Sequence, residues 1–205
     1  MPAPVLSGDR VVLRPLEERD VEVRRSYGWH REIERGYGHV RATGPMTEAE
    51  AQQWYADLLP FRDDPSWIIE VDGRAAGGIF LHSHVVEDRR ARLAIGLVAP
   101  ELLGHGYGTE AVLLVLAHAF GAMGLHRVDL RVLDVNAGAI ACYRRCGFVE
   151  EGRERESCQV DGVWRDDIVM GILDREFRAL AALPRSAVSG SPTVALRQVR
   201  RAPDR

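Results

Sequence analysis

The sequence predicts a mixed α/β domain whose central sheet is largely antiparallel. Three observations support this class. Strand-like stretches follow one another and are joined by the two-residue turns Asp72-Gly73 and Asp161-Gly162, which are typical of antiparallel hairpins. Helical patterns lie between some strands but do not follow each one, as they would in a series of βαβ units. A glycine-rich loop directly precedes a strongly apolar helix near the middle of the chain.

Length and composition indicate one globular domain. The chain has 205 residues, of which 46% are hydrophobic and 28% are charged, so disorder throughout and fibrous classes are excluded. We assign residues 6–182 to this domain. After Leu183, Pro, Ser, Gly and Arg dominate and Asp204 is the only acidic residue. Residues 183–205 are therefore expected to form a basic tail that is either flexible or pairs with a neighbouring chain.

The first third of the chain predicts one strand and two helices. Residues 10–16 form an apolar strand, and residues 17–27 form a charged amphipathic helix. The stretch 28–44 is rich in Gly and aromatic residues and shows no clear period. The segment Thr47-Glu48-Ala49-Glu50 is a capping box that opens a helix to about Leu59.

Three further strands are predicted in the middle of the chain. Residues 67–71 lead through the first hairpin turn into a strand that continues over 79–85. A charged turn over 87–90 then leads to the apolar strand 93–99, which Pro100 ends.

The rest of the chain predicts two helices, one half-buried strand and a terminal hairpin. They are the helix 111–123, the strand 127–134, a helix from Asn136 to Cys146, and the hairpin strands 148–160 and 163–173. Asn136 suits the N-cap of the second helix, and Gly147 suits the left-handed position after its end. The predicted order is β-α-α-β-β-β-loop-α-β-α-β-β.

The loop before the apolar helix carries the strongest functional signal. Gly104, Gly106 and Gly108 stand at alternate positions, and the helix opens at Thr109-Glu110. Such a loop lets backbone N–H groups converge at the positive end of a helix dipole, which predicts a phosphate or pyrophosphate ligand. A turn that serves packing alone is the competing interpretation.

Two other nucleotide sites fit this loop less well. A Rossmann site needs GxGxxG after a first strand and further βαβ crossovers, whereas GxGxG stands here in mid-chain. Asp129 or Asp134 could still imitate its ribose-binding acid. A P-loop NTPase is excluded because the chain contains no Lys to follow the glycines.

Three blocks of the sequence resemble the Gcn5-related N-acetyltransferase (GNAT) superfamily, over about residues 6–174. Residues 103–111 (LGHGYGTEA) resemble its acetyl-CoA loop, [Arg/Gln]-x-x-Gly-x-[Gly/Ala], and Asn136, Tyr143 and Gly147-Phe148 resemble its next block. The opening residues 9–16 (DRVVLRPL) are similar to the branch of the RimJ/RimL ribosomal-protein N-acetyltransferases.

The resemblance implies acetyl-CoA as cosubstrate and a sheet that splays at the acetyl-CoA site. It implies that the strand before the loop offers free backbone groups to the pantetheine arm, and that the loop amides bind the pyrophosphate. By position, these groups belong to Leu97, Val98 and Ala99 in the strand, and to Gly104, His105, Gly106, Tyr107, Gly108 and Thr109 in the loop. Asn136 is expected either to reach the cosubstrate or to serve only as an N-cap.

The resemblance also places Tyr143 near the thioester sulfur, where a phenol can protonate the departing thiolate. A half-buried helix aromatic is the competing interpretation of Tyr143. The chain departs from the family pattern at three positions. Leu103 replaces the opening Arg/Gln, Ala94 replaces a frequent glutamate, and Ala139 replaces a frequent serine.

Together these features predict direct acetyl transfer to a primary amine, with the backbone N–H near Val98 polarising the thioester carbonyl. Because no base stands at Ala94, an amine of low pKa is favoured, such as the α-amine of a protein N-terminus. His82 and His84 could serve as base but are more often plain strand residues. The alternatives are an acetyltransferase for an aminoglycoside or polyamine, and a non-catalytic CoA-binding domain.

Charge and cysteine usage restrict the partners. The formal net charge of −3 gives no electrostatic basis for binding nucleic acid or an anionic membrane. The three cysteines show no disulfide framework or metal-ligand spacing, so neither a metal nor a covalent cysteine route is expected. The chain shows no signal peptide, and His118 interrupts its longest apolar run, so we expect a cytoplasmic protein. The oligomeric state stays open, with a homodimer as one option.

Overall fold

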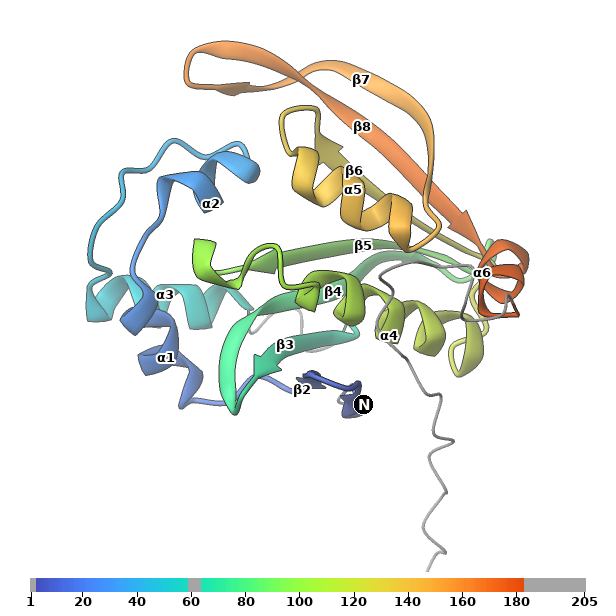
Figure 1. Ribbon diagram of the computed structural model, residues 1–205, viewed down its shortest axis with the longest axis horizontal. Coiled ribbons are helices and arrows are strands. Elements are labelled where there is room, and N and C mark those ends of the chain that lie inside the picture. The colour runs from blue at the N-terminus through green and yellow to red at the C-terminus, as the bar shows by residue number, and fades with distance from the viewer. Residues whose placement is uncertain (1–2, 59–63, 183–205) are drawn as a thin grey trace, which may run out of the picture.

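The computed structural model describes residues 3–58 and 64–182. The predicted tail 183–205 lies outside these residues, as does Leu59, near which the second helix is expected to end. The fold is one eight-stranded sheet with helices against it, in the order β1-β2-β3-β4-β5-β6-β8-β7 (Figure 1). The strands are β1 (Leu6–Ser7), β2 (Val11–Arg14), β3 (Ser66–Val71), β4 (Arg74–Val85), β5 (Arg90–Leu97), β6 (Arg127–Leu133), β7 (Val149–Val160) and β8 (Val163–Leu173).

All neighbouring strands run antiparallel except β5 and β6, so the predicted class is confirmed. The helices are α1 (Asp20–Tyr27), α2 (Arg31–Gly36), α3 (Glu48–Leu58), α4 (Tyr107–Gly121), α5 (Ala137–Arg145) and α6 (Asp174–Ala181), with a short 3₁₀ turn over Pro100–Leu102. None of the helices in residues 3–58 and 64–182 combines the length and the apolar character that a membrane span requires.

Local signals in the sequence place most elements correctly. At the first hairpin turn, Asp72 and Gly73 both have positive φ, as a type I′ turn requires, and the second hairpin turn does the same. Thr47 and Glu50 form the reciprocal bonds of the capping box, Glu50 N to Thr47 Oγ1 at 3.2 Å and Thr47 N to Glu50 Oε2 at 2.8 Å. Gly147 takes the left-handed conformation after α5, with φ +94°.

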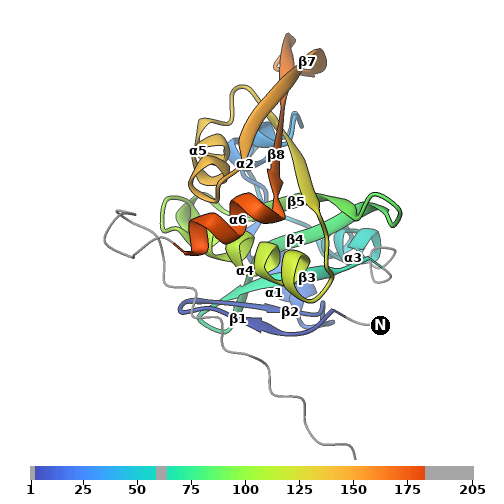
Figure 2. The same ribbon diagram turned by 90° about the vertical axis from the view of Figure 1, so that its right-hand side faces the viewer.

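The sequence interpretation misses β1, α2 and α6. The first two have 2 and 6 residues, too few for a period to show. The third is an amphipathic helix whose Glu176 bonds back to the Leu173 N–H at 2.9 Å. It packs on α4 through Phe177 and Phe120, whose ring centroids are 5.5 Å apart (Figure 2). Its pattern is recognisable in hindsight, because a capping glutamate precedes apolar positions at helical spacing.

The sheet splits between β5 and β6. These strands pair only over Arg90–Arg127, Ala91–Val128 and Arg92–Asp129, at the start of both strands. Beyond Arg92, β5 stays paired with β4, whereas β6 stays paired with β8. The two halves of the sheet therefore diverge, and the splay that the resemblance implies is present. Helix α4 bridges the two halves by packing on β1, β2, β5 and β6.

Candidate active site

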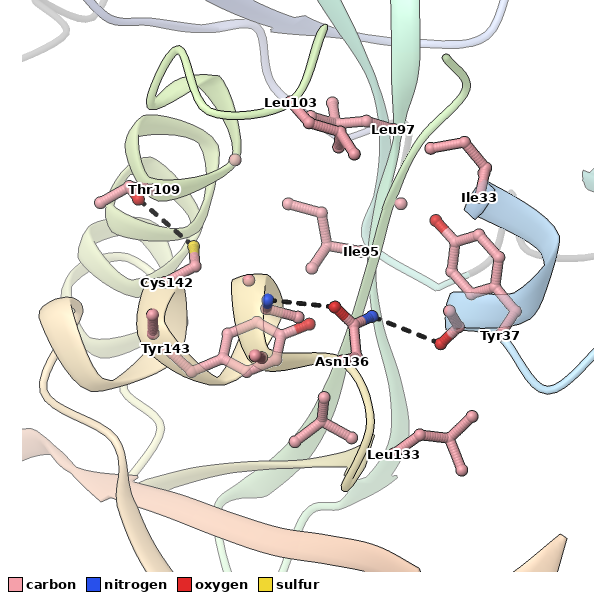
Figure 3. Close-up of a pocket in the computed structure, with 18 of the residues that line it drawn as sticks. Ile33, Tyr37, Ile95, Leu97, Leu103, Thr109, Leu133, Asn136, Cys142 and Tyr143 are labelled. Carbon is pink, nitrogen blue, oxygen red and sulfur yellow. Dashed lines mark hydrogen bonds between the residues drawn. The ribbon is translucent and has the colours of Figure 1, made fainter. Parts of the chain in front are cut away.

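A large cleft occupies the point where β5 and β6 diverge. Its volume is about 1840 Å³, well above the roughly 300–1,000 Å³ of sites for drug-sized ligands, so it has room for an extended cosubstrate. Figure 3 shows that α4 and α5 lie on one side of β5 and that α2 lies on the other. The first side holds the loop 104–109 and Tyr143, where acetyl-CoA is expected, and we call it the cosubstrate half. The second side holds Arg31, Arg35 and Tyr37, and we call it the acceptor half, as the place left for the second substrate.

The glycine loop and the start of α4 form one wall of the cosubstrate half. Gly104 and Gly106 have φ of +78° and +84°, which glycine adopts without strain. Helix α4 begins at Tyr107 rather than Thr109, with Gly106 as N-cap. A glycine has no side chain to cap a helix, so the first N–H groups of α4 keep no partner within the helix. All six predicted loop residues line the cleft, and their amides fit an anionic group.

The backbone of β5 corrects one prediction. Successive residues in an antiparallel strand point their N–H groups to opposite sides. The Val98 N–H donates to the carbonyl of Ala76 at 3.0 Å, on the β4 side, and is therefore not free. Neither Val98 nor the fully buried Ala99 lines the cleft. The register is regular from Leu97 to Arg92, so the N–H of Leu97 points toward β6, into the splay. Of the three predicted strand residues, the structure brings only Leu97 into the cleft.

Tyr143 extends from α5 into the cosubstrate half, and its hydroxyl points toward the centre of the cleft (Figure 3). The ring packs edge-on against Phe148, with centroids 5.9 Å apart, and only 7% of the residue is exposed. Burial raises the pKa of Tyr143 well above its ordinary value near 10. The phenol therefore stays protonated and can donate a hydrogen bond to an atom in the cleft that gains negative charge during a reaction.

Asn136 is the N-cap of α5, as predicted, and it also joins α5 to α2. Its Oδ1 accepts the Ala139 N–H at 3.2 Å, and its Nδ2 donates to the Gly36 carbonyl at 3.4 Å. Both ends of the side-chain amide thus have protein partners. The residue lies at the junction of the two halves of the cleft (Figure 3), and a contact with the cosubstrate stays a prediction.

The acceptor half is formed by residues that the sequence interpretation does not single out. The hydroxyl of Tyr37, next to the end of α2, lies against Gly96, where an added Cβ would come within 1.8 Å of it. Arg31 and Arg35 on α2 both pair with Asp161 in the β7–β8 turn, at 3.0 and 3.2 Å. These pairs hold the tip of the long hairpin against α2 (Figure 1). These ion pairs join residues about 130 positions apart, so no local sequence pattern could have predicted them.

The two histidines that could act as base are separated by the structure. His82 lines the cleft, whereas His84 does not, because the β4–β5 register shifts between His82 and Val85. Burial, followed by the nearby Arg92, lowers the pKa of His82, so its ring is neutral at pH 7. His82 on β4 pairs with Arg92 on β5, and Arg92 is two residues from Ala94, the position at which the family often has a glutamate. Its role as a base stays a prediction.

Cys142 lies closer to the cleft than the sequence suggests. Its Sγ is 3.3 Å from Thr109 Oγ1 (Figure 3), and Cys146 is fully buried behind it. A hydrogen bond with Cys146 lowers the pKa of the Cys142 thiol to about 7. A partly ionised thiol in the cosubstrate half is a possible nucleophile, so the direct and covalent routes need a test.

We expect transfer to be direct, and the Cys142→Ala/Cys146→Ala double variant to keep kcat within about threefold of the wild type. Both thiols contact Thr109 on the α4 side of the cleft, away from α2. The double variant should lose some stability, because Cys146 is packed in the core. Mass spectrometry of the protein incubated with acetyl-CoA alone provides the second readout. An acetylated Cys142, together with loss of turnover in the variant, would establish the covalent route instead.

Comparison with known proteins agrees with this geometry. A family model described as "Acetyltransferase (GNAT) domain" matches residues 10–149. The chain is 27% identical to the Spermidine N(1)-acetyltransferase of Escherichia coli, over 84% of the chain and 91% of that protein. It is 32% identical to the "Putative ribosomal N-acetyltransferase YdaF" of Bacillus subtilis, over 52% of the chain and 57% of that protein. A 39% identical match with the "Probable N-acetyltransferase YjcK" of the same species covers only 39% of that protein.

Solved structures share the fold over most of the chain. The crystal structure of a "putative acetyltransferase" from T. thermophilus superposes with a TM-score of 0.75, at 26% identity, over 89% of this chain and 95% of that one. The spermidine N-acetyltransferase of Vibrio cholerae, solved with CoA and spermine, gives a TM-score of 0.68 at 25% identity, over 82% of this chain and 98% of that one.

Proposed function

The chain belongs to the GNAT acetyltransferase family and is an acetyl-CoA-dependent N-acetyltransferase, and we propose that it acetylates an amine that enters between α2 and the β7–β8 hairpin. The observation that carries this proposal is the continuity of the cleft across the β5–β6 splay, with Leu97 and Tyr143 both in its lining. We take residues 6–182 as the acetyltransferase domain.

Acetyl-CoA would lie in the cosubstrate half, and the donors present there fit it. The amides from Gly104 to Thr109 would take the pyrophosphate at the N-terminus of α4. The pantetheine arm would run along β5 in the splay, where the backbone groups of Leu97 and Ile95 face away from β4. The Leu97 N–H, rather than that of Val98, would then polarise the thioester carbonyl.

The amine would attack the thioester carbon from the acceptor half, on the side of α2. As its lone pair forms the new C–N bond, the C–S bond breaks and its electrons leave with the sulfur. The Tyr143 hydroxyl would stabilise and protonate this thiolate. The amine must lose one proton to a base or to water, and His82, neutral and in the cleft, is the candidate among the residues described.

The charge of the cleft favours an acceptor that is not a polycation. Two arginines share the single carboxylate of Asp161 in the acceptor half. The lining of the whole cleft holds Arg10, Arg31, Arg35, Arg92, Arg131 and Arg145 together with Asp9, Glu32, Asp161 and Asp167, and Arg10, Arg92 and Arg131 also pair with Glu110, Asp129 and Glu154. The lining itself therefore has no excess of carboxylates to attract a polycation. A peptide α-amine, with an ordinary pKa near 7.7–8.0, also needs less help to lose its proton than a lysine or polyamine nitrogen near 10. We therefore propose a protein or peptide N-terminus as acceptor.

A polyamine is the second candidate, because the relatives from E. coli and V. cholerae are named for spermidine. Four acceptors tested side by side would separate the candidates. They are a lysine-free peptide with a free α-amine, an Nα-blocked peptide with one lysine, spermidine, and an aminoglycoside.

We expect the highest kcat/KM for the free α-amine, with spermidine at least about tenfold lower because the lining has no excess of carboxylates to attract a polycation. The measurement is CoA release followed by thiol detection, with product mass as confirmation. A higher kcat/KM for spermidine would assign the polyamine function. Tight CoA binding without turnover on any of the four would mean that the acceptor belongs to none of these classes, and would overturn the proposed N-terminus.

A further inference from the structure

The turn between β1 and β2 is fastened to the first turn of α4. The carboxylate of Glu110 is fully buried and accepts the backbone N–H of Arg10 at 2.8 Å and that of Val11 at 3.2 Å. Gly8 packs so closely on this carboxylate that an added Cβ would come within 2.3 Å of Oε1. Residues about 100 positions apart are thus held together, and Arg10 has a fixed place beside the glycine loop.

The Arg10 side chain wraps around this loop. Its Nε donates to Glu110 Oε2 at 3.1 Å, and its Nη1 donates to the His105 carbonyl at 2.7 Å. The guanidinium lies 5.4 Å from the centre of the Tyr107 ring. Its Nη2 lies beside Gly106, 3.1 Å from where a Cβ would stand. In residues 3–58 and 64–182, Nη2 donates no hydrogen bond.

In the Arg10–Glu110 ion pair, only the positive charge faces the cleft, which favours binding of an anion there. The Glu110 carboxylate is sealed in the core, whereas the Arg10 side chain is 44% exposed and lines the cleft. An anion at the loop therefore meets the guanidinium and the N–H groups of α4 before it meets the carboxylate. The His105 carbonyl accepts the bond from Nη1, so the guanidinium offsets the partial negative charge of this oxygen.

We propose that Arg10 is a ligand of the acetyl-CoA pyrophosphate, with Nη2 donating to a phosphate oxygen beside the loop amides. The loop opens here on Leu103, which has no polar group to offer, and the β1–β2 turn supplies a cation from a distant part of the chain. A guanidinium binds phosphate through charge-assisted hydrogen bonds and keeps its charge at all working pH values. This inference rests on the proposed placement of acetyl-CoA.

The test measures binding of three ligands by calorimetry to the wild type, Arg10→Gln and Arg10→Lys. The ligands are CoA, dephospho-CoA, which lacks the 3′-phosphate, and pantetheine, which lacks all phosphates. Because a charge-assisted hydrogen bond is lost at a half-exposed site, Arg10→Gln should weaken CoA and dephospho-CoA equally, by about tenfold. Pantetheine should bind the wild type and Arg10→Gln with equal affinity, because it has no phosphate. Arg10→Lys should recover part of the loss.

A salt series separates a direct contact from a purely structural role of Arg10. If the guanidinium touches phosphate, the dependence of log Kd on log salt concentration should be shallower in Arg10→Gln than in the wild type. A structural role would lower Tm and affinity while leaving this slope unchanged, which would overturn the proposal. A loss seen with CoA but not with dephospho-CoA would place Arg10 at the 3′-phosphate and overturn it as well.

The same data distinguish this inference from the proposed function. A wild type that binds CoA, with an Arg10→Gln variant of equal affinity, would remove Arg10 from the site and leave the cleft assignment intact. A wild type that binds no CoA would overturn both.

Discussion

Tyr143→Phe is expected to lower kcat by about 10²–10⁴-fold while the KM for acetyl-CoA changes little. The substitution removes only the hydroxyl, so the edge-on contact of the ring with Phe148 and the packing of α5 survive. What is lost is the hydroxyl that we propose as the donor to the departing thiolate. Steady-state rates with a free α-amine peptide, and single-turnover rates that isolate the chemical step, measure the effect.

Tyr27→Phe is a matched control, because Tyr27 is on α1 and does not line the cleft. It should leave kcat unchanged. A Tyr143→Phe variant with kcat within twofold of wild type, and chemistry shown to be rate-limiting, would remove Tyr143 from the mechanism. The thiolate would then leave unassisted or take its proton from water.

The pH dependence follows from the direction of the pKa shift. Because burial raises the pKa of Tyr143 above its ordinary value near 10, the phenol stays protonated throughout pH 7–10. The ratio of wild-type to Tyr143→Phe kcat should therefore be constant over this range. A ratio that falls toward one as the pH approaches 10 would mean that the phenol ionises in the working enzyme.

Gly106→Val is expected to weaken CoA binding by well over tenfold, because the valine side chain would occupy the space where the proposed pyrophosphate site needs close approach of the backbone. The residue has φ +84°, where a β-branched side chain is strained, and its Cβ would stand 3.1 Å from Arg10 Nη2. Calorimetry with CoA measures the loss, and circular dichroism with thermal melting shows whether the variant is folded.

Gly124→Ala provides the matched control for backbone strain. Gly124 also has positive φ, +64°, but it lies beyond the end of α4, with no atom within 4 Å of an added Cβ. It should lower Tm without changing CoA affinity. If Gly106→Val does not fold, Gly106→Ala keeps the test, with a smaller expected loss. Unchanged CoA affinity in a folded Gly106 variant would contradict the placement of the pyrophosphate.

The elements that the sequence predicts correctly are those that local chemistry determines. Two Asp-Gly turns specify the hairpins, because both residues tolerate positive φ, and Asn136 and Gly147 mark the ends of α5. The capping box places the start of α3. The glycine spacing before the apolar helix identifies a loop that lines the cleft, and phosphate binding by this loop stays a prediction.

The predictions that fail, or that the sequence could not make, concern register and long-range contact. The sequence identifies the strand before the loop, but only its pairing with β4 shows that the Val98 N–H is used and that the Leu97 N–H faces the splay. A shift of one residue reverses which side every N–H faces, so this assignment depends on register rather than composition.

By itself, then, the sequence determined the fold class, the hairpins, the helix caps and the glycine loop before α4, because the signals for each lie within a few residues. Only the tertiary structure decided that Arg31 and Arg35 pair with Asp161 in the β7–β8 turn, that the Tyr37 hydroxyl lies against Gly96, and that Arg10 reaches the loop around Gly106. These contacts join residues about 60 to 130 positions apart. They exist because the sheet splits between β5 and β6 and brings distant segments to its opening, which no local pattern in the chain encodes.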